Sequence, residues 1–360
     1  MNDPALPEHP SWVRRVDRPL ARAAAEVRLL GAVTPTNAER ERTRMIAEVE
    51  AGGDARPRWE YARAHDSVRE HLAEAEAALR GETGALAEAY AARVAEVRLE
   101  AEMATVAGTP RLGALARRRF AASSFASAAS ELARQWIAAP PDSQRETIRS
   151  DAPDPRSLLS RMRAAVGERK LPFSVVARDG LAPLAATGER TILVACRRDV
   201  TEEDALRTVL HEIEGHAMPR VRARSRAIGL FGIGTARGAD EQEGYALLLE
   251  ERAGFATPRR RRQLAARHLA VEAMLGGATF ADVTRMLVDR GIDARAAVLA
   301  AERAFRGGDG ACAGLGRERV YVEALLRVRA HLDAHSEHES VVSSGQVAIG
   351  SIDALIGATR

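Results

Sequence analysis

The first 165 residues alternate apolar and polar positions with the period of an α-helix, and few residues there would interrupt one. Thr36 or Asn37 is suited to cap the first clear helix, because short polar side chains accept hydrogen bonds from free backbone N–H groups. The pattern predicts helices over 38–49, 58–106 (one helix, or a hairpin turning at 81–84), 111–138 and 143–166.

Near residue 167 the pattern changes. Short β-branched runs at 173–177 and 191–195 predict two strands. Thr201 with Asp204 resembles a capping box, and the helix that it opens should stop by Pro219, because the residue before a proline disfavours the helical conformation. Further helices are predicted over 240–253 and from 258, whereas 334–350 reads as polar and weakly specified. The predicted fold is α+β and mostly helical, with a helical region at 1–166 and an α+β region with a small sheet at 167–360.

Composition narrows the classes of partner. Hydrophobic residues make up 46% of the chain but aromatic residues only 4%, which favours closely packed helices over an aromatic-rich sandwich. The 53 basic and 50 acidic residues nearly balance at a net charge of +3, so neither nucleic acid nor a membrane is expected as partner.

The expected compartment is the cytoplasm. The first residues have no apolar segment of a secretory signal, and no run reaches the roughly 18 apolar residues of a spanning helix. Cys196 and Cys312 are too few for a disulfide framework and indicate two reduced thiols.

Candidate chemistry lies in residues 209–219, which read Val-Leu-His-Glu-Ile-Glu-Gly-His-Ala-Met-Pro. His211 and His216 are five residues apart, which on a regular α-helix separates them by about 140° and prevents a shared metal. A local π-bulge would bring them together, and Gly215 is the residue type that tolerates such a distortion. Glu212 would then face the open position of a bound metal as general base.

A catalytic zinc site takes three protein ligands and one exchangeable water, so a third ligand is required. The helix predicted from residue 240 offers Glu241 and Glu243. Glu243 shares its face with Ala246 and Leu247, so it is expected to point inward, where a carboxylate needs a partner. The alternative is that the histidines are ordinary core or surface residues and the two glutamates only complement the helix dipole. A di-iron bundle is a further option, but it needs a Glu-x-x-His pair on each of two helices, and no such pair is found.

These residues carry a family resemblance. The stretch 211–216 followed by 241–246 resembles the HExxxH and QEGLA motifs of an atypical gluzincin-like metallopeptidase family that includes the tubulinyl-tyrosine carboxypeptidases. Likeness at 35–38, 59–61 and 320–323 extends it over most of the chain. The resemblance implies a zincin-like region at 167–360 and one zinc ion per chain. It also implies the roles of the motif residues: His211, His216 and Glu243 as ligands, and Glu212 as base.

The chain departs from the family pattern at three places. Tyr245 stands at the QEGLA leucine, Pro219 stands where the family usually has an arginine, with Arg220 next, and the usual Asn-Gly between the motifs is missing. These changes leave the metal ligands intact but leave substrate recognition open.

The implied activity is hydrolysis at the C-terminus of a peptide or protein. Tyr321 is the candidate donor to the oxyanion, with simple packing as the alternative. Arg220 and Arg319 are candidates, with Arg317, for the substrate carboxylate, because arginine binds carboxylates in bidentate geometry. The other class of function is a non-catalytic regulatory or binding protein that retains the fold. The cleaved protein, the choice between terminal and internal cleavage, and the oligomeric state remain open at this point.

Overall fold

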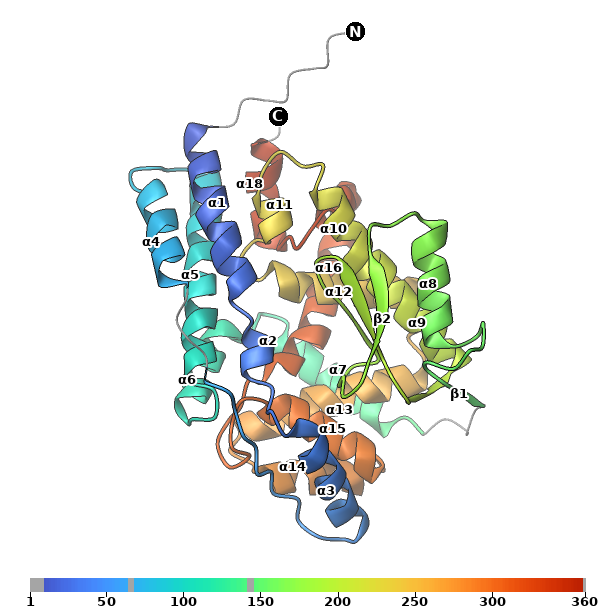
Figure 1. Cartoon of the computed structure of the whole chain (residues 1–360). Helices are drawn as coiled ribbons and strands as arrows, with labels where there is room; N and C mark the ends of the chain where they lie inside the picture. Colours follow the sequence, from blue (N-terminus) through green and yellow to red (C-terminus); the bar gives the residue numbers. More distant parts are fainter. Residues whose placement is uncertain (1–9, 64–67, 141–145, 359–360) are drawn as a thin grey trace. The chain divides into compact units, whose positions relative to one another are not determined.

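The structure is a computed structural model, which describes residues 10–63, 68–140 and 146–358 (Figure 1). Contacts between residues divide the chain into two units, each built from separated stretches. We call Asp142–Thr257 with Arg327–Arg360 (and Met1–His9) the sheet unit, and Pro10–Pro141 with Pro258–Leu326 the helical unit. The α+β, mostly helical fold class is confirmed. The predicted regions 1–166 and 167–360 have other bounds than these two units, and the predicted division stays a prediction.

The helical unit packs an alanine-rich core in which Phe280 and Phe305 are fully buried and Trp59 meets Phe280 edge-on. Few aromatic rings are needed because alanine lets helices approach closely. α16, Val320–Ala334, begins in this unit and ends in the sheet unit. The other helices of the unit are α1 Ser11–Glu26, α2 Leu29–Ala32, α3 Ala38–Glu50, α4 Arg69–Ala78, α5 Ala85–Thr105, α6 Arg111–Arg119, α7 Ala126–Ala138, α13 Pro258–Leu275, α14 Phe280–Asp289, α15 Ala294–Phe305 and the 3₁₀ turn η2 Arg317–Arg319.

At the start of the helical unit the structure differs from two predictions. The helix at 38–49 is present as α3, but Asn37 does not cap it: its side chain donates to Arg58 C=O (2.8 Å) and accepts from Glu60 N–H (3.1 Å). These bonds hold the backbone of 58–60 in a loop against Asn37 instead of a helix. The helix predicted from residue 58 therefore starts only at Arg69. The hairpin alternative is correct, with α4 and α5 separated by a turn at 79–84.

The single helix predicted over 111–138 is wrong, because it is broken between α6 and α7. At the break, the Glu323 carboxylate accepts hydrogen bonds from Ser123 N–H (2.9 Å) and from its hydroxyl (2.7 Å). An N–H that donates to a distant carboxylate is not available to a helix, so this tertiary contact overrides the local propensity.

The sheet unit holds two small sheets. β2 Ser174–Arg178, β4 Thr191–Ala195 and β3 Ala185–Thr187 form one in the order β2-β4-β3, with β2 parallel and β3 antiparallel to β4. β1 Thr147–Arg149 and β5 Asp199–Thr201 form an antiparallel pair. The helices are α8 Leu158–Glu168, α9 Glu202–Leu210, the π-helix η1 His211–Ala217, α10 Met218–Ala223, α11 Leu230–Ile233, α12 Gly238–Arg252, α17 Glu339–Val342 and α18 Ile352–Gly357, with 3₁₀ turns η3 Ser336–His338 and η4 Ile349–Ser351.

The core of the sheet unit lies between α8, the three-stranded sheet and η1. Ile192 and Val194 of β4 are fully buried, and Ile213 and Ala217 of η1 pack into the same cluster. Apolar residues therefore fix the inner face of η1 against the sheet, and its other face is left to carry polar groups.

The strands predicted at 173–177 and 191–195 are confirmed as β2 and β4, but the helix predicted over 143–166 is wrong for most of its length. Residues 141–145 lie outside the described residues, β1 follows, and the helix begins only after Ser157, whose hydroxyl accepts from Ser160 N–H. β1 is three residues long and exists through its pairing with β5, which local sequence does not reveal.

The prediction that the motif helix stops by Pro219 is also wrong. Thr201 caps it as expected, but it runs through α9, η1 and α10 to Ala223. Met218 N–H donates to Ile213 C=O, five residues back. Pro219 follows at the return to α-helical bonding and lacks an N–H, so the proline costs little at this point.

The segment 334–350 is better ordered than its polar sequence indicates. Val341, Val342, Ser344 and Val347 are buried there. Its turns follow from tertiary packing rather than from a periodic apolar pattern.

Candidate metal centre

The π-helix η1 corrects the spacing of the two histidines. With hydrogen bonds to the fifth residue back, residues five apart lie on one face. His211 Nε2 and His216 Nε2 are 3.2 Å apart, and their ring centroids are 4.9 Å apart. The local π-bulge predicted from the sequence is therefore confirmed.

Gly215 permits the packing that completes the site. A Cβ atom at this position would lie 2.5 Å from the Cβ of Ala246 on α12, far inside van der Waals contact. The absence of a side chain lets η1 and α12 approach closely, which brings the residues of the second motif to the histidines.

Glu243 of α12 faces both histidines. Its Oε2 lies 3.5 Å from His211 Nε2 and 3.7 Å from His216 Nε2, and the three side chains are only 12–13% exposed. Glu241 instead accepts a hydrogen bond from Arg327 Nε (2.5 Å), and burial raises its pKa. Of the two glutamates that the sequence offered, the structure brings Glu243 to the histidines.

The outer nitrogen of each histidine is held by an acceptor. His211 Nδ1 lies 2.7 Å from Glu250 Oε1, and His216 Nδ1 lies 2.9 Å from the amide oxygen of Gln242. A neutral imidazole that donates through Nδ1 presents a lone pair at Nε2. Two lone pairs and a carboxylate then face one another, an arrangement that repels itself unless a cation lies between them.

The electrostatics of the site favour a positive charge. Burial lowers the pKa of His211, but hydrogen bonds to Glu243 and Glu250 outweigh it and raise that pKa to about 9. Glu250 is itself 1% exposed and lies 3.6 Å from Arg207, which also binds Asp204. The raised pKa means that His211 holds its proton more tightly than an ordinary histidine. A metal ion bound here would replace that proton and supply positive charge in its place.

Glu212, the candidate base, is held from the sheet. Its Oε2 accepts a hydrogen bond from the hydroxyl of Thr187 in β3 (2.8 Å), and the residue is buried. The carboxylate is thereby fixed on the η1 helix beside His211.

The segment after α17 supports the second histidine. Gln346 Nε2 donates to Gln242 Oε1 (3.3 Å), and Gln242 Nε2 donates to Gly345 C=O (3.4 Å). These bonds orient the amide so that its oxygen faces His216.

Sequence reasoning did not identify Thr187, Gln242, Glu250 or Gln346. Glu250 had a signal, because it lies seven residues after Glu243 and so on the same face of the helix. Gln242 lies inside the recognised motif. Thr187 and Gln346 lie in a short strand and a turn and have no local signal.

The predicted substrate-binding residues fall in different units. Arg220 lies on α10 of the sheet unit, and its guanidinium binds Glu189 (2.6 Å). Arg319 and Tyr321 belong to the helical unit. There Arg319 binds Glu323 (2.9 Å), and the guanidinium of Arg317 lies 5.7 Å from the centre of the Tyr321 ring. The roles of these three residues stay predictions.

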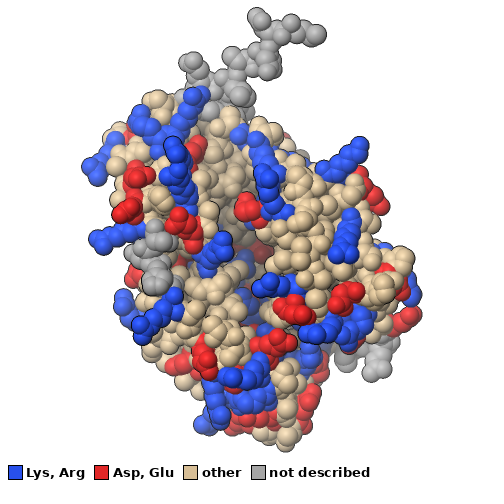
Figure 2. Space-filling model, viewed as in Figure 1, with Lys and Arg blue, Asp and Glu red and all other residues tan. Residues whose placement is uncertain are grey.

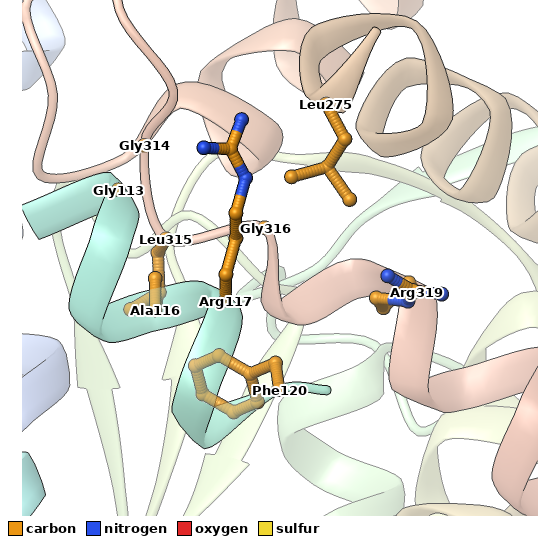
Figure 3. A pocket seen from close by; sticks show the side chains of 9 residues that line it. All are labelled: Gly113, Ala116, Arg117, Phe120, Leu275, Gly314, Leu315, Gly316 and Arg319. Atoms are coloured by element: carbon orange, nitrogen blue, oxygen red, sulfur yellow. The ribbon is translucent and has the colours of Figure 1, made fainter. Parts of the chain in front are cut away.

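Arg319 also lines a pocket of about 250 Å³ within the helical unit, with Arg117, Phe120 and Leu275 among its neighbours (Figure 3).

On the face drawn in Figure 2, basic and acidic side chains are interspersed. The absence of a nucleic-acid partner stays a prediction. Among the helices in the described part of the chain, none is both long and apolar enough to cross a bilayer.

The structure thus defines a mostly helical α+β protein in which two histidines of a π-helix and a glutamate of the next long helix form a group suited to a metal. A sequence model of the family described as microtubule-associated tyrosine carboxypeptidase matches residues 49–355, and the chain belongs to this family. No curated protein matches the chain. The tubulin-carboxypeptidase part of the resemblance is confirmed, whereas the assignment of the metal residues stays a proposal.

Proposed function

We propose that this protein is a zinc-dependent carboxypeptidase that removes the C-terminal residue, a tyrosine as in the description of its family, from a protein tail. The observation that carries the proposal is the convergence of His211 Nε2, His216 Nε2 and a Glu243 oxygen within 4.8 Å of one another.

The donor set fits zinc. Two imidazole nitrogens and one carboxylate are the ligands of many catalytic zinc sites, and three protein ligands leave a position open. The hydrogen bonds at both Nδ1 atoms fix the ring orientation that such ligands need. When bound, zinc polarises the scissile carbonyl and lowers the pKa of a water.

Glu212 moves the protons. One of its carboxylate oxygens is held by Thr187, and the carboxylate takes a proton from the attacking water and returns it to the leaving amine. The fixed orientation matters because a general base acts only within hydrogen-bond reach of the proton.

Arg220 is the best placed candidate in the sheet unit for the terminal carboxylate. Its partner Glu189 is 84% exposed, and an ion pair with so exposed a carboxylate is weak enough to be exchanged for the carboxylate of a substrate. A guanidinium can bind a carboxylate through two parallel hydrogen bonds. Arg319 as an alternative candidate for the same carboxylate and Tyr321 as oxyanion donor remain part of the proposal.

The competing function is a binding protein that retains the fold without turnover. Glu212→Gln separates the two, because it keeps the shape of the side chain and removes the base. We expect zinc bound at His211, His216 and Glu243 to be retained, and hydrolysis of a peptide ending in tyrosine to fall about 10²–10⁴-fold.

Glu214→Gln is the matched control, since Glu214 lies on the same π-helix but binds Arg169 (3.0 Å) at the surface. It should leave the rate unchanged. A Glu212→Gln protein as active as the wild type contradicts the mechanism, and a wild type that binds zinc but cleaves no tyrosine-ending tail favours the binding protein.

A further inference from the structure

A second group of histidines lies at the C-terminal end of α16, in the sheet unit. His331, His335 and His338 are spaced so that one helical turn and the following 3₁₀ turn bring their rings together. The ring centroids are 5.1–5.3 Å apart, and His335 and His338 stack at an interplanar angle of 20°.

A carboxylate completes this cluster. One ligand atom from each of His335, Glu337 and His338 lies within 4.8 Å of the others. Glu337 Oε1 is 3.5 Å from His335 Nδ1 and 3.9 Å from His338 Nε2. The buried centre has the same composition, two imidazoles and one carboxylate, with its carboxylate 3.5 and 3.7 Å from the histidine nitrogens.

His331 orients the cluster. Its Nε2 lies 3.0 Å from His338 Nδ1. When His338 donates through Nδ1 to His331, its Nε2 carries the lone pair that faces Glu337. A neighbour that binds the outer nitrogen of a histidine is the usual support of a metal ligand, and Glu250 and Gln242 have this role in the buried centre.

We propose that His335, Glu337 and His338 form a second zinc site, with His331 as its positioning residue. Its side chains are more exposed than those of the buried centre, 51% for His335 and 67% for Glu337, so the ion exchanges with solvent and binds more weakly.

The position of this site gives it a structural consequence. The three ligands span the turn between α16 and α17, and α17 begins at the next residue, Glu339. Glu339 accepts hydrogen bonds from Tyr245 (3.2 Å) and Arg252 (2.6 Å), both on α12. Zinc bound at the turn would therefore restrain the start of the segment that continues to Gly345 and Gln346. These two residues hydrogen-bond to Gln242.

Zinc stoichiometry tests the proposal directly. Full-length, tag-free protein is stripped of metal, titrated with zinc chloride and weighed by native mass spectrometry. We expect two ions on the wild type, one on His335→Asn/His338→Asn, one on His216→Ala, and none when the three changes are combined. His71→Asn, which removes a partly buried histidine of the helical unit, is the control and should retain two.

The second site is overturned by a wild type whose only ion is kept by the His335→Asn/His338→Asn protein, or by a His335→Asn/His338→Asn protein that still takes up two ions. Should His216→Ala fail to fold, the wild type and the double variant still decide the question. The two sites are separable: one ion that only the double variant loses supports the second site and counts against the buried one.

The role of His331 has its own readout. His331→Leu should weaken zinc binding at the second site about 10–100-fold, the usual effect of removing a neighbour that orients a ligand. His331→Gln, which keeps an acceptor, should restore part of the affinity. Equal affinity in the leucine variant and the wild type overturns the positioning role.

Discussion

The two histidine–carboxylate groups of the sheet unit have the same donor types but reach them in different ways. His211, His216 and Glu243 come from two helices more than 20 residues apart in sequence, and their side chains are 12–13% exposed. His335, Glu337 and His338 lie within four residues and are partly or largely open to solvent.

The difference teaches what each arrangement needs. A buried group must be held by neighbours: Glu250 and Gln242 bind its two histidines, and Thr187 donates to Glu212 beside it. An exposed local group needs little beyond the backbone turn that carries it. Tertiary support should therefore decide the stability and affinity of the first group far more than of the second.

The largest expected effect is at Glu250. Glu250→Ala removes a buried carboxylate that pairs with His211 and Arg207, so the free energy of unfolding should fall by about 3 kcal/mol. The loss is not larger because Asp204 remains as a partner of Arg207. Chemical denaturation measures it. Glu251→Ala, the next residue, breaks a more exposed pair with Arg329 and should cost less than about 1 kcal/mol. Equal losses in the two variants would show that burial does not distinguish these pairs.

The next effect concerns Gln242, which orients a histidine of the buried group and, among the described residues, forms no hydrogen bond with the exposed group. Gln242→Leu removes the acceptor of His216 Nδ1 and should weaken zinc binding at the buried site about 10–100-fold, as measured by competition with a chelator. Binding at the second site should not change. An unchanged affinity at the buried site would mean that Gln242 does not orient His216.

Gly215→Ala tests the close approach of η1 and α12. The added Cβ meets Ala246, so we expect a loss of about 1–3 kcal/mol in the free energy of unfolding. Gly167→Ala on α8, where a Cβ meets nothing within 4 Å, should instead stabilise the protein by about 0.5–1 kcal/mol. Similar changes at both glycines would remove the case for a required contact.

The smallest effect concerns the substrate. Arg220→Ala should raise KM for a peptide ending in tyrosine about tenfold, the equivalent of about 1.4 kcal/mol, with kcat nearly constant. Steady-state kinetics separates the two constants. Arg169→Ala, which removes the surface partner of Glu214, is the control. A fall in kcat without a change in KM would argue against carboxylate binding by Arg220.

Local sequence predicted the elements that carry strong local signals. The cap at Thr201, the strands β2 and β4, and the π-bulge all follow from side chains within one or two turns of the feature itself. The i, i+5 spacing of the histidines is the clearest case, because a π-helical turn places residues five apart on one face.

The features that the sequence did not predict depend on residues distant in the chain. β1 exists because β5 pairs with it, and the break at 120–125 accompanies bonds from Ser123 to Glu323. In the site, Thr187 and Gln346 reach their partners Glu212 and Gln242 only through the fold. Such contacts leave no period or spacing in the sequence, so the residues that support the candidate ligands were harder to predict than the ligands.

The central claim is that His211, His216 and Glu243 bind one zinc ion. The most direct test is elemental mass spectrometry of tag-free protein that carries His335→Asn and His338→Asn, so that only the buried group is counted. We predict about one zinc per chain, retained with Glu212→Gln and lost with His216→Ala. Protein prepared without chelator that holds no zinc, or a His216→Ala variant that keeps it, would contradict the account.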